Sequence, residues 1–391
     1  MHEGALLLLE LGGIVLGLGL LGRLAARFGF SPIPLYLIGG LAIGDGGIAP
    51  IVISEDFIEI GAEIGVVLLL LMLGLEFTGR ELVSSVRSTA PVGFTDLAIN
   101  AAPGLIGGLV LGLGPTGALF LGGVTYISSS GVIAKLISDL GWLANRETPA
   151  VLSLLVFEDL AMAVLLPVLG AIAIGGEFSG VVLAATAALV AVALILAIGA
   201  RHGDRISRAM FSSSDEVNLL TLLGITLLVA GAAERLSVSA AVGAFLVGIG
   251  VSGEAVGRAR TLLAPLRDLF AAVFFVFFGI QTDPRALPPI AFAVLALAVA
   301  SSVTKLLVGW WAAARVGAGR SARLRAGVLL VARGEFSIVI AGLGLAAGVD
   351  ERLGLLAVGY VLVTAVVGPV AAKIVDSRSV SRPGPRSVGE H

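Results

Sequence analysis

The amino-acid sequence predicts an all-α protein that crosses a membrane about thirteen times. The first observation behind this prediction is composition, because 57% of the 391 residues are hydrophobic and only 13% are charged. Soluble globular chains carry about a quarter charged residues, so the composition indicates a polytopic membrane protein. The chain contains no cysteine, which excludes disulfide bonds, thiolate catalysis and cysteine-ligated metal sites.

The second observation is a series of apolar runs, each bounded by charged or Pro/Gly-containing loops. The runs cover residues 5–26, 33–49, 57–75, 90–112, 116–140, 148–174, 180–200, 216–233, 237–251, 266–281, 288–314, 322–347 and 353–375. Residues 1–376 are therefore expected to form one membrane domain, and residues 377–391 a disordered cytoplasmic tail. The stretches 201–215 and 253–265 are expected to be interfacial helices or solvated loops.

The third observation is the placement of basic residues, which gives the orientation. With the N-terminus outside, twenty of the 25 Lys and Arg residues fall in cytoplasmic segments and three on the opposite side. The other two, Lys305 and Arg333, lie inside predicted spans. Because basic residues are enriched in cytoplasmic loops, the sequence predicts an N-out, C-in topology.

The odd number of runs indicates an internal repeat. If the seventh run is a linker, two sets of six remain, and the second set begins on the opposite side of the membrane. This is the inverted-repeat plan of many secondary transporters, whose binding sites lie near the midplane between the repeats. The fifth run then corresponds to the twelfth, and the fourth to the eleventh.

Two adjacent acids, Glu158 and Asp159, lie in the middle of the sixth run, which has no other charged residue from Ala150 to Ile174. A charged side chain at the centre of a membrane helix costs roughly 2.5 to 3.5 kcal/mol even on lenient insertion scales, and such acids usually mark ion or proton pathways. The alternative is that both are neutral, or paired only to hold the helices together.

The fifth and twelfth runs each contain residues that disfavour a continuous helix. Ser128, Ser129 and Ser130 stand next to Gly131 near the centre of the fifth run, and Arg333-Gly334-Glu335 occupies the centre of the twelfth. Freed carbonyls and hydroxyls at such a break can bind a dehydrated cation, and charged side chains can face the helix ends. The alternatives are packing of small residues and an Arg–Glu pair that only fastens helices.

Lys305 lies in the eleventh run at the same predicted depth as Glu158, Ser128 and Arg333. A partner acid is expected for it, either Glu158 or Asp159. A carboxylate at this depth can bind H⁺ or a cation but not readily both, and this competition is sufficient for proton-coupled exchange. The remaining acids of the spans are expected to be network or boundary groups near span ends: Glu10, Glu63, Glu76 and Asp96.

Five stretches of the chain, taken together, resemble the monovalent cation:proton antiporter-2 family, in particular its Kef-type branch. They are residues 65–76 (GVVLLLLMLGLE), 125–131 (TYISSSG), 157–159 (FED), 274–279 (FFVFFG) and 333–336 (RGEF). The resemblance covers residues 5–375. It implies the sodium/proton antiporter fold, with crossing discontinuous helices, a core bundle that moves against a dimerisation bundle, and a homodimer.

The resemblance also implies roles for the site residues. Asp159 matches the ion- and proton-carrying aspartate of the family, and Glu158 occupies the preceding position, where relatives carry Asp, Asn or Gln. Cation ligands are expected beside Asp159, and further charged groups are expected to balance charge and hold the broken helices. The expected ligands are Thr125, Ser128 and Ser129, and the expected charge-balancing residues are Lys305, Arg333 and Glu335.

The sequence therefore predicts a secondary antiporter, not an enzyme, that exchanges K⁺, or as a second choice Na⁺, for H⁺ across the inner membrane of a prokaryote. No cofactor, bound metal or nucleic acid is expected. The expected partners are the lipid bilayer, a second copy of the chain and a separate cytoplasmic regulatory subunit. This last expectation follows the Kht-type arrangement, because the chain carries no fused nucleotide-binding domain.

Two other function classes are alternatives to an antiporter. A ligand-gated cation channel could use the same polar midplane as a continuous pore. A membrane-bound enzyme is not supported, because the sequence offers no nucleophile–base pair, metal triad or cofactor motif.

Overall fold

The computed structural model of the protein describes residues 2–28, 31–44, 46–48, 55–75, 79–173, 212–235, 240–251 and 253–380, and the single positions 182, 186 and 190. All regular structure within these residues is helical, as predicted. Among the described residues, seven helices are long and apolar enough to cross a membrane, and three shorter apolar helices accompany them. The predicted run 180–200 and the stretch 201–211 fall almost entirely outside the described residues.

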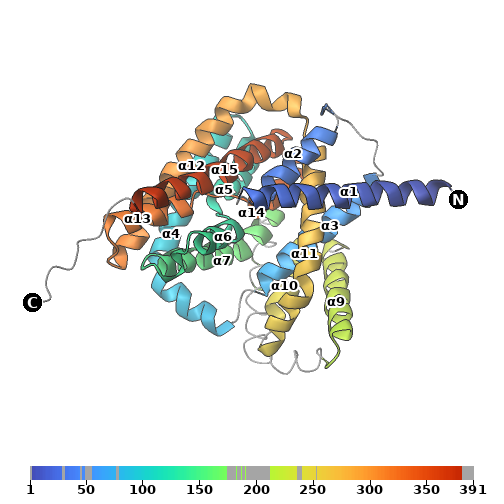
Figure 1. Ribbon diagram of the computed structural model, residues 1–391, viewed down its shortest axis with the longest axis horizontal. Coiled ribbons are helices and arrows are strands. Elements are labelled where there is room, and N and C mark those ends of the chain that lie inside the picture. The colour runs from blue at the N-terminus through green and yellow to red at the C-terminus, as the bar shows by residue number, and fades with distance from the viewer. Residues whose placement is uncertain are drawn as a thin grey trace, which may run out of the picture.

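One group of helices lies on the right of Figure 1 and is built around α3 and α11. Its members are α1 (His2–Arg27), α2 (Ile33–Ile43), α3 (Glu55–Gly74), α9 (Asp215–Arg235), α10 (Ala240–Gly250) and α11 (Glu254–Ile280). The stretch 253–265, expected to be an interfacial helix or a loop, is instead the first part of α11. The helix continues through Pro265, so the charged residues and the proline do not end it.

Glycine pairs allow two close helix contacts in this group. A Cβ at Gly40 of α2 would lie 2.9 Å from Gly279 Cα of α11, and a Cβ at Gly74 of α3 would lie 2.9 Å from Gly248 Cα of α10. Real side chains do not fit at such distances, so small residues are what bring these backbones together. The contact of α2 with α11 and the contact of α3 with α10 thus both depend on a pair of facing glycines.

The second group lies on the left of Figure 1 and contains the buried charged residues Asp96, Glu158, Asp159, Lys305 and Arg333. Its members are α4 (Gly79–Val110), α5 (Gly114–Tyr126), α6 (Ser130–Asp139), α7 (Thr148–Ala173), α12 (Leu287–Arg315), α13 (Arg320–Leu329), α14 (Glu335–Ala346) and α15 (Arg352–Val380). Two short 3₁₀ turns, η1 (Trp142–Ala144) and η2 (Pro284–Ala286), connect neighbouring helices. The helix α15 continues to Val380, so the first residues of the tail expected to be disordered are helical.

Both expected helix breaks are present. The fifth predicted run is divided into α5 and α6, because the chain turns extended at Ile127 and the helix resumes at Ser130. The twelfth run is divided into α13 and α14 by residues 330–334. Weak helix formers coincide with both breaks: a serine run at the first, and Gly334 at the second.

The largest buried apolar cluster joins the two groups of helices. Phe274 and Phe278 of α11 belong to it, together with Phe336 and Ile340 of α14 and Phe120 of α5. Of the broken helices, α5 and α14 therefore share a core with the first group, whereas α6 and α13 belong to a separate apolar cluster within the second group.

Candidate functional site

The two helix breaks meet at one point in the second group of helices. The Ser129 backbone N–H donates a hydrogen bond to Ala332 O across the crossing, at 2.9 Å. A Cβ at Gly334 would lie 2.5 Å from Ser129 Oγ and 2.9 Å from Ser129 Cβ, so only glycine permits this approach. Two segments about two hundred residues apart in the chain are thus held in backbone contact.

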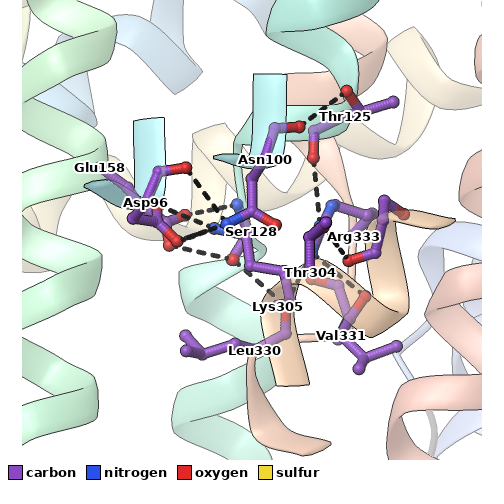
Figure 2. A network of polar contacts seen from close by, with 12 residues as sticks. Asp96, Asn100, Thr125, Ser128, Glu158, Thr304, Lys305, Leu330, Val331 and Arg333 are labelled. Carbon is purple, nitrogen blue, oxygen red and sulfur yellow. Dashed lines mark hydrogen bonds and ion pairs between the residues drawn. The ribbon is translucent and has the colours of Figure 1, made fainter. Parts of the chain in front are cut away.

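Arg333 is completely buried and satisfies carbonyls that the breaks leave free. Its Nη1 donates to Leu330 O at 2.7 Å, and its Nη2 donates to Thr125 O at 3.1 Å. These oxygens lie at the C-terminal ends of α13 and α5, where the helix dipole favours a positive charge. Its Nε donates to the hydroxyl of Tyr360 in α15, at 3.0 Å. The right side of Figure 2 shows Arg333 turned toward these ends.

Glu335 provides the opposite charge at the other two helix ends. It is the first residue of α14, and its carboxylate accepts a hydrogen bond from Ser129 Oγ at 3.0 Å, next to the start of α6. Negative charge is favoured at helix N-termini. Within the described residues Arg333 and Glu335 form no ion pair with each other, so the alternative of an Arg–Glu pair that only fastens helices is not what the structure contains.

Glu158 of α7 is completely buried and held by three donors. Its carboxylate accepts from the Ser128 backbone N–H at 2.6 Å, from Ser128 Oγ at 3.1 Å, and from Lys305 Nζ at 2.8 Å. The first break is thus tied to α7 and α12 through a single carboxylate. Glu158, one of the two acids expected to be the partner of Lys305, therefore contacts it.

Asp96 of α4 was expected to be a network or boundary group, and it belongs to a buried network. Its direct pairing with Lys305 was not predicted: it is completely buried, and Lys305 Nζ lies 2.9 and 3.0 Å from its two oxygens. Asn100, one turn later, donates to Asp96 Oδ1 at 2.8 Å. In Figure 2, dashed lines connect the Lys305 ammonium to the carboxylates of Asp96 and Glu158. The polar pair Asp96 and Asn100 at i, i+4 in an apolar helix was the available signal.

Asp159 lies on α7 next to Glu158 and is only 4% exposed. Adjacent residues on a helix point about 100° apart, so its side chain leaves α7 on a different side from that of Glu158. Unlike Glu158, it is not among the acids that form an ion pair with Lys305. The two acids therefore have different surroundings.

The three hydroxyl residues expected to bind a cation have different partners. Thr125 Oγ1 donates to Asn100 O at 3.0 Å and accepts from the Gly104 N–H at 3.1 Å, so it connects α5 to α4. Ser128 contacts Glu158, and Ser129 contacts Glu335. All three lie at or beside the first break, but only the Ser128 hydroxyl is bonded to an acid of α7.

A cavity of about 710 Å³ separates parts of the two groups of helices. Its lining comes from α3, α9, α10 and α11 on one side and from α7 and α14 on the other, and it is mostly apolar. Leu166 of α7 lines it, and this residue lies seven positions after Asp159, about 10 Å along the helix axis. Glu63 of α3, expected to be a network or boundary group, also lines the cavity.

Comparison with known proteins gives a consistent result along the whole chain. The family model described as "Sodium/hydrogen exchanger, transmembrane" matches residues 13–375. The K(+)/H(+) antiporter subunit KhtU of Bacillus subtilis is 33% identical over 385 residues, which cover 96% of this chain and 95% of the relative. The ammonium/H(+) antiporter subunit AmhT of Alkalihalophilus pseudofirmus is 30% identical over 370 residues, covering 92% and 91%.

A solved structure has the same fold. The sodium proton antiporter MjNhaP1 from Methanocaldococcus jannaschii at pH 8 matches with a TM-score of 0.72 at 19% sequence identity. The match covers 96% of this chain and 100% of that one. At this identity the likeness establishes the fold alone.

Proposed function

Because the chain belongs to the sodium/hydrogen exchanger family of secondary transporters, we propose that it exchanges a monovalent cation for H⁺ at Asp159. K⁺ is the first choice of cation and Na⁺ the second. H⁺ and the cation each carry one positive charge, so either one neutralises the Asp159 carboxylate. Because they compete for one buried acid, the protein carries one or the other across the membrane.

The observation that carries the proposal is the contrast between the two adjacent acids of α7. Glu158 is fixed by Ser128 and Lys305, and its charge is balanced inside the protein. Asp159, the next residue, is 4% exposed and leaves the helix on another side. Glu158 therefore anchors the site, and Asp159 is the acid that exchanges its partner. Ser128, Ser129 and Thr125 are proposed to contribute oxygen atoms to the cation, with Ser128 the best placed of the three.

The crossing of the broken helices supports this assignment because protein side chains compensate the charge of the exposed helix ends. Arg333 at two helix C-termini and Glu335 at two N-termini compensate the ends that the breaks expose. Non-helical backbone at membrane depth is tolerated where it is enclosed by protein or lines a cavity. In our proposal these two residues hold the breaks in register and do not themselves carry the cation.

Alternating access is proposed to arise from movement of one group of helices against the other. The second group, which contains the breaks, is the proposed core bundle, and the first is the proposed dimerisation bundle of a homodimer. The cavity between them is lined by Leu166 of α7, and it provides space into which the core bundle can move. The mostly apolar lining allows sliding without breaking many polar contacts.

An inverted repeat is supported by matched contacts in the two halves of the chain. The contact of α2 with α11 corresponds to that of α3 with α10, and the contact of α4 with α7 corresponds to that of α12 with α15. The break between α5 and α6 corresponds to that between α13 and α14. Together with the distribution of basic residues, this favours about thirteen spans in an N-out, C-in topology.

The choice of K⁺ as the cation, and of a regulatory subunit as a partner, is based on the names of the related proteins. KhtU is named as a subunit of a K(+)/H(+) antiporter, and the chain covers nearly all of it. We therefore propose that the protein acts in a prokaryotic plasma membrane with a separate cytoplasmic regulatory subunit. AmhT is named for ammonium, an ion of similar size to K⁺, which keeps a second substrate of the same charge in consideration.

The proposal is tested by reconstituting the purified protein in liposomes that contain a pH-sensitive dye. An outward K⁺ gradient should drive H⁺ inward, and a proton gradient should drive K⁺ in the opposite direction. Parallel gradients of Na⁺, Li⁺, Rb⁺ and NH₄⁺ rank the cations. Cation flux that proceeds without proton movement would contradict antiport and would support the alternative of a gated channel.

A further inference from the structure

Four arginines surround the turn between α12 and α13, far along the chain from Asp159. Arg315 ends α12 and Arg320 begins α13. The Nε of Arg323 donates to Ala318 O in the turn, at 2.8 Å. Arg146, from the connection between α6 and α7, lies against Gly317, where an added Cβ would be 3.1 Å from its Nη2. We call Arg146, Arg315, Arg320 and Arg323 the arginine surface.

The positive charge of the arginine surface is not balanced by acids of the described residues. The segment from residue 284 to residue 334 contains no Asp or Glu. Nearby, Glu147 pairs with Arg325, which is not part of the surface. None of the four arginines forms an ion pair within the part of the chain that the structure describes. Four guanidinium groups around one turn therefore favour an anion.

Two exposed tryptophans place this surface at the edge of the bilayer. Trp310 and Trp311, at the end of α12, are 38% and 37% exposed. Arg323 lies over the ring of Trp310 at 5.9 Å, and Arg315 over that of Trp311 at 5.6 Å. Tryptophan is enriched at the membrane–water interface, where its apolar ring and its N–H contact different surroundings.

The same face of α12 continues as an apolar surface into the membrane. Val303 and Leu307 are 49% and 62% exposed and lie about two turns and one turn before Trp311, respectively. The span formed by residues 284–315 has only 28% of its apolar stretch buried inside the protein, so most of it faces lipid. Acyl chains along this face would bring a lipid phosphate to the level of the arginines.

We propose that the arginine surface binds the phosphate headgroups of anionic phospholipids in the adjacent leaflet, with the acyl chains lying along α12. Guanidinium groups match phosphate oxygens in geometry as well as in charge. Arg325, on the other side of α13, is paired with buried Glu147 and stacks on buried Trp142 at 5.6 Å. In this proposal, headgroups on one side and this pair on the other fix the first turns of α13 at the membrane surface. An acidic soluble protein would not use the apolar face below the tryptophans.

Intrinsic fluorescence tests this directly, because the chain has only three tryptophans and Trp142 is buried. The protein is reconstituted in phosphatidylcholine containing a small fraction of brominated phosphatidylglycerol or, separately, of brominated phosphatidylcholine. Bromine quenches tryptophan at short range, so preferential binding of the anionic lipid gives stronger quenching at equal fraction. The expected preference falls about fivefold for each arginine removed, or roughly 100-fold for three.

The test variant is Arg315→Gln combined with Arg320→Gln and Arg323→Gln. The control is Arg258→Gln with Arg267→Gln, two arginines of α11 that pair with Asp215 and Asp268. The control should quench as the original protein does. If the triple variant does not fold, added salt should remove the preference in the original protein, because exposed charges are screened. Equal quenching by both lipids overturns the proposal and would favour a soluble acidic partner at the arginine surface. A preference for the anionic lipid that is retained in the triple variant also overturns it.

Discussion

Lys305 Nζ lies 2.9 and 3.0 Å from the two carboxylate oxygens of Asp96 while it also lies 2.8 Å from Glu158. All three side chains are completely buried. One ammonium group therefore connects α4, α7 and α12 and serves two carboxylates. Because a buried charge without a partner is far more costly than a paired one, each of these residues constrains the other two.

Replacement of Lys305 by methionine is expected to destabilise the protein strongly. The variant keeps the length of the side chain but leaves the carboxylates of Asp96 and Glu158 without their shared cation. Removing one member of a buried ion pair costs about 3 to 5 kcal/mol. Thermal unfolding in detergent measures this as a large fall in Tm. A second variant that also carries Asp96→Asn and Glu158→Gln should recover much of the loss, and an unchanged Tm in Lys305→Met would contradict the proposed role.

Asp96→Asn is expected to be milder than Lys305→Met, because Lys305 keeps Glu158 as its partner. The variant loses one carboxylate of the cluster and retains a side chain of the same shape. We expect a smaller fall in Tm together with a clear change in the exchange rate, since the charge beside Glu158 is altered. Asp268→Asn, on an exposed residue of α11, is the matched control and should change neither. If Asp96→Asn had the same Tm and exchange rate as Asp268→Asn, Asp96 would have no influence on the site.

Arg333→Lys is expected to abolish exchange although it preserves the charge. Arg333 reaches Leu330 O, Thr125 O and the Tyr360 hydroxyl with separate N–H groups, and a lysine ammonium cannot span them. Tyr360→Phe removes the contact with Arg333 and the hydrogen bond to Ser301 Oγ, and it should cost about 1.5 to 3 kcal/mol of stability with part of the activity retained. Comparable exchange by Arg333→Lys and the original protein would mean that charge alone is needed at this crossing.

Gly334→Ala tests the contact between the two breaks. The new Cβ would lie within 3 Å of Ser129 Oγ and Cβ, so the crossing segments must separate. We expect loss of exchange, with the protein still folded as judged by its elution from a sizing column. Gly224→Ala in α9, where an added Cβ meets nothing within 4 Å, is the control and should be active. Full activity of Gly334→Ala would indicate that the breaks need not touch.

Local sequence was sufficient to predict the breaks and most of the buried charges. A charged residue in the middle of an apolar run has few roles open to it, which is why Glu158, Lys305 and Arg333 could be selected. The serine run and Gly334 carry the low helix propensity that separates α5 from α6 and α13 from α14. These signals depend only on neighbours within a few residues.

The partners could not be predicted in the same way, because they come from distant segments. Asp96 contacts Lys305 across 209 positions of the chain, and Arg333 contacts Thr125 O across 208. Which acid meets Lys305 depends on the rotation of α4 about its axis, and an apolar sequence does not specify that. Charged residues before Pro265 also obscured the start of α11, since the packing of that helix outweighs the proline.

Asp159→Asn in reconstituted liposomes tests the central claim most directly. The substitution preserves the shape of the side chain and removes the group proposed to bind H⁺ and the cation in turn. We predict that K⁺ and Na⁺ gradients no longer move protons, while Tm stays close to that of the original protein, and that Asp268→Asn measured beside it exchanges normally. Normal cation-driven proton movement by Asp159→Asn would contradict the assignment of Asp159 as the shared site.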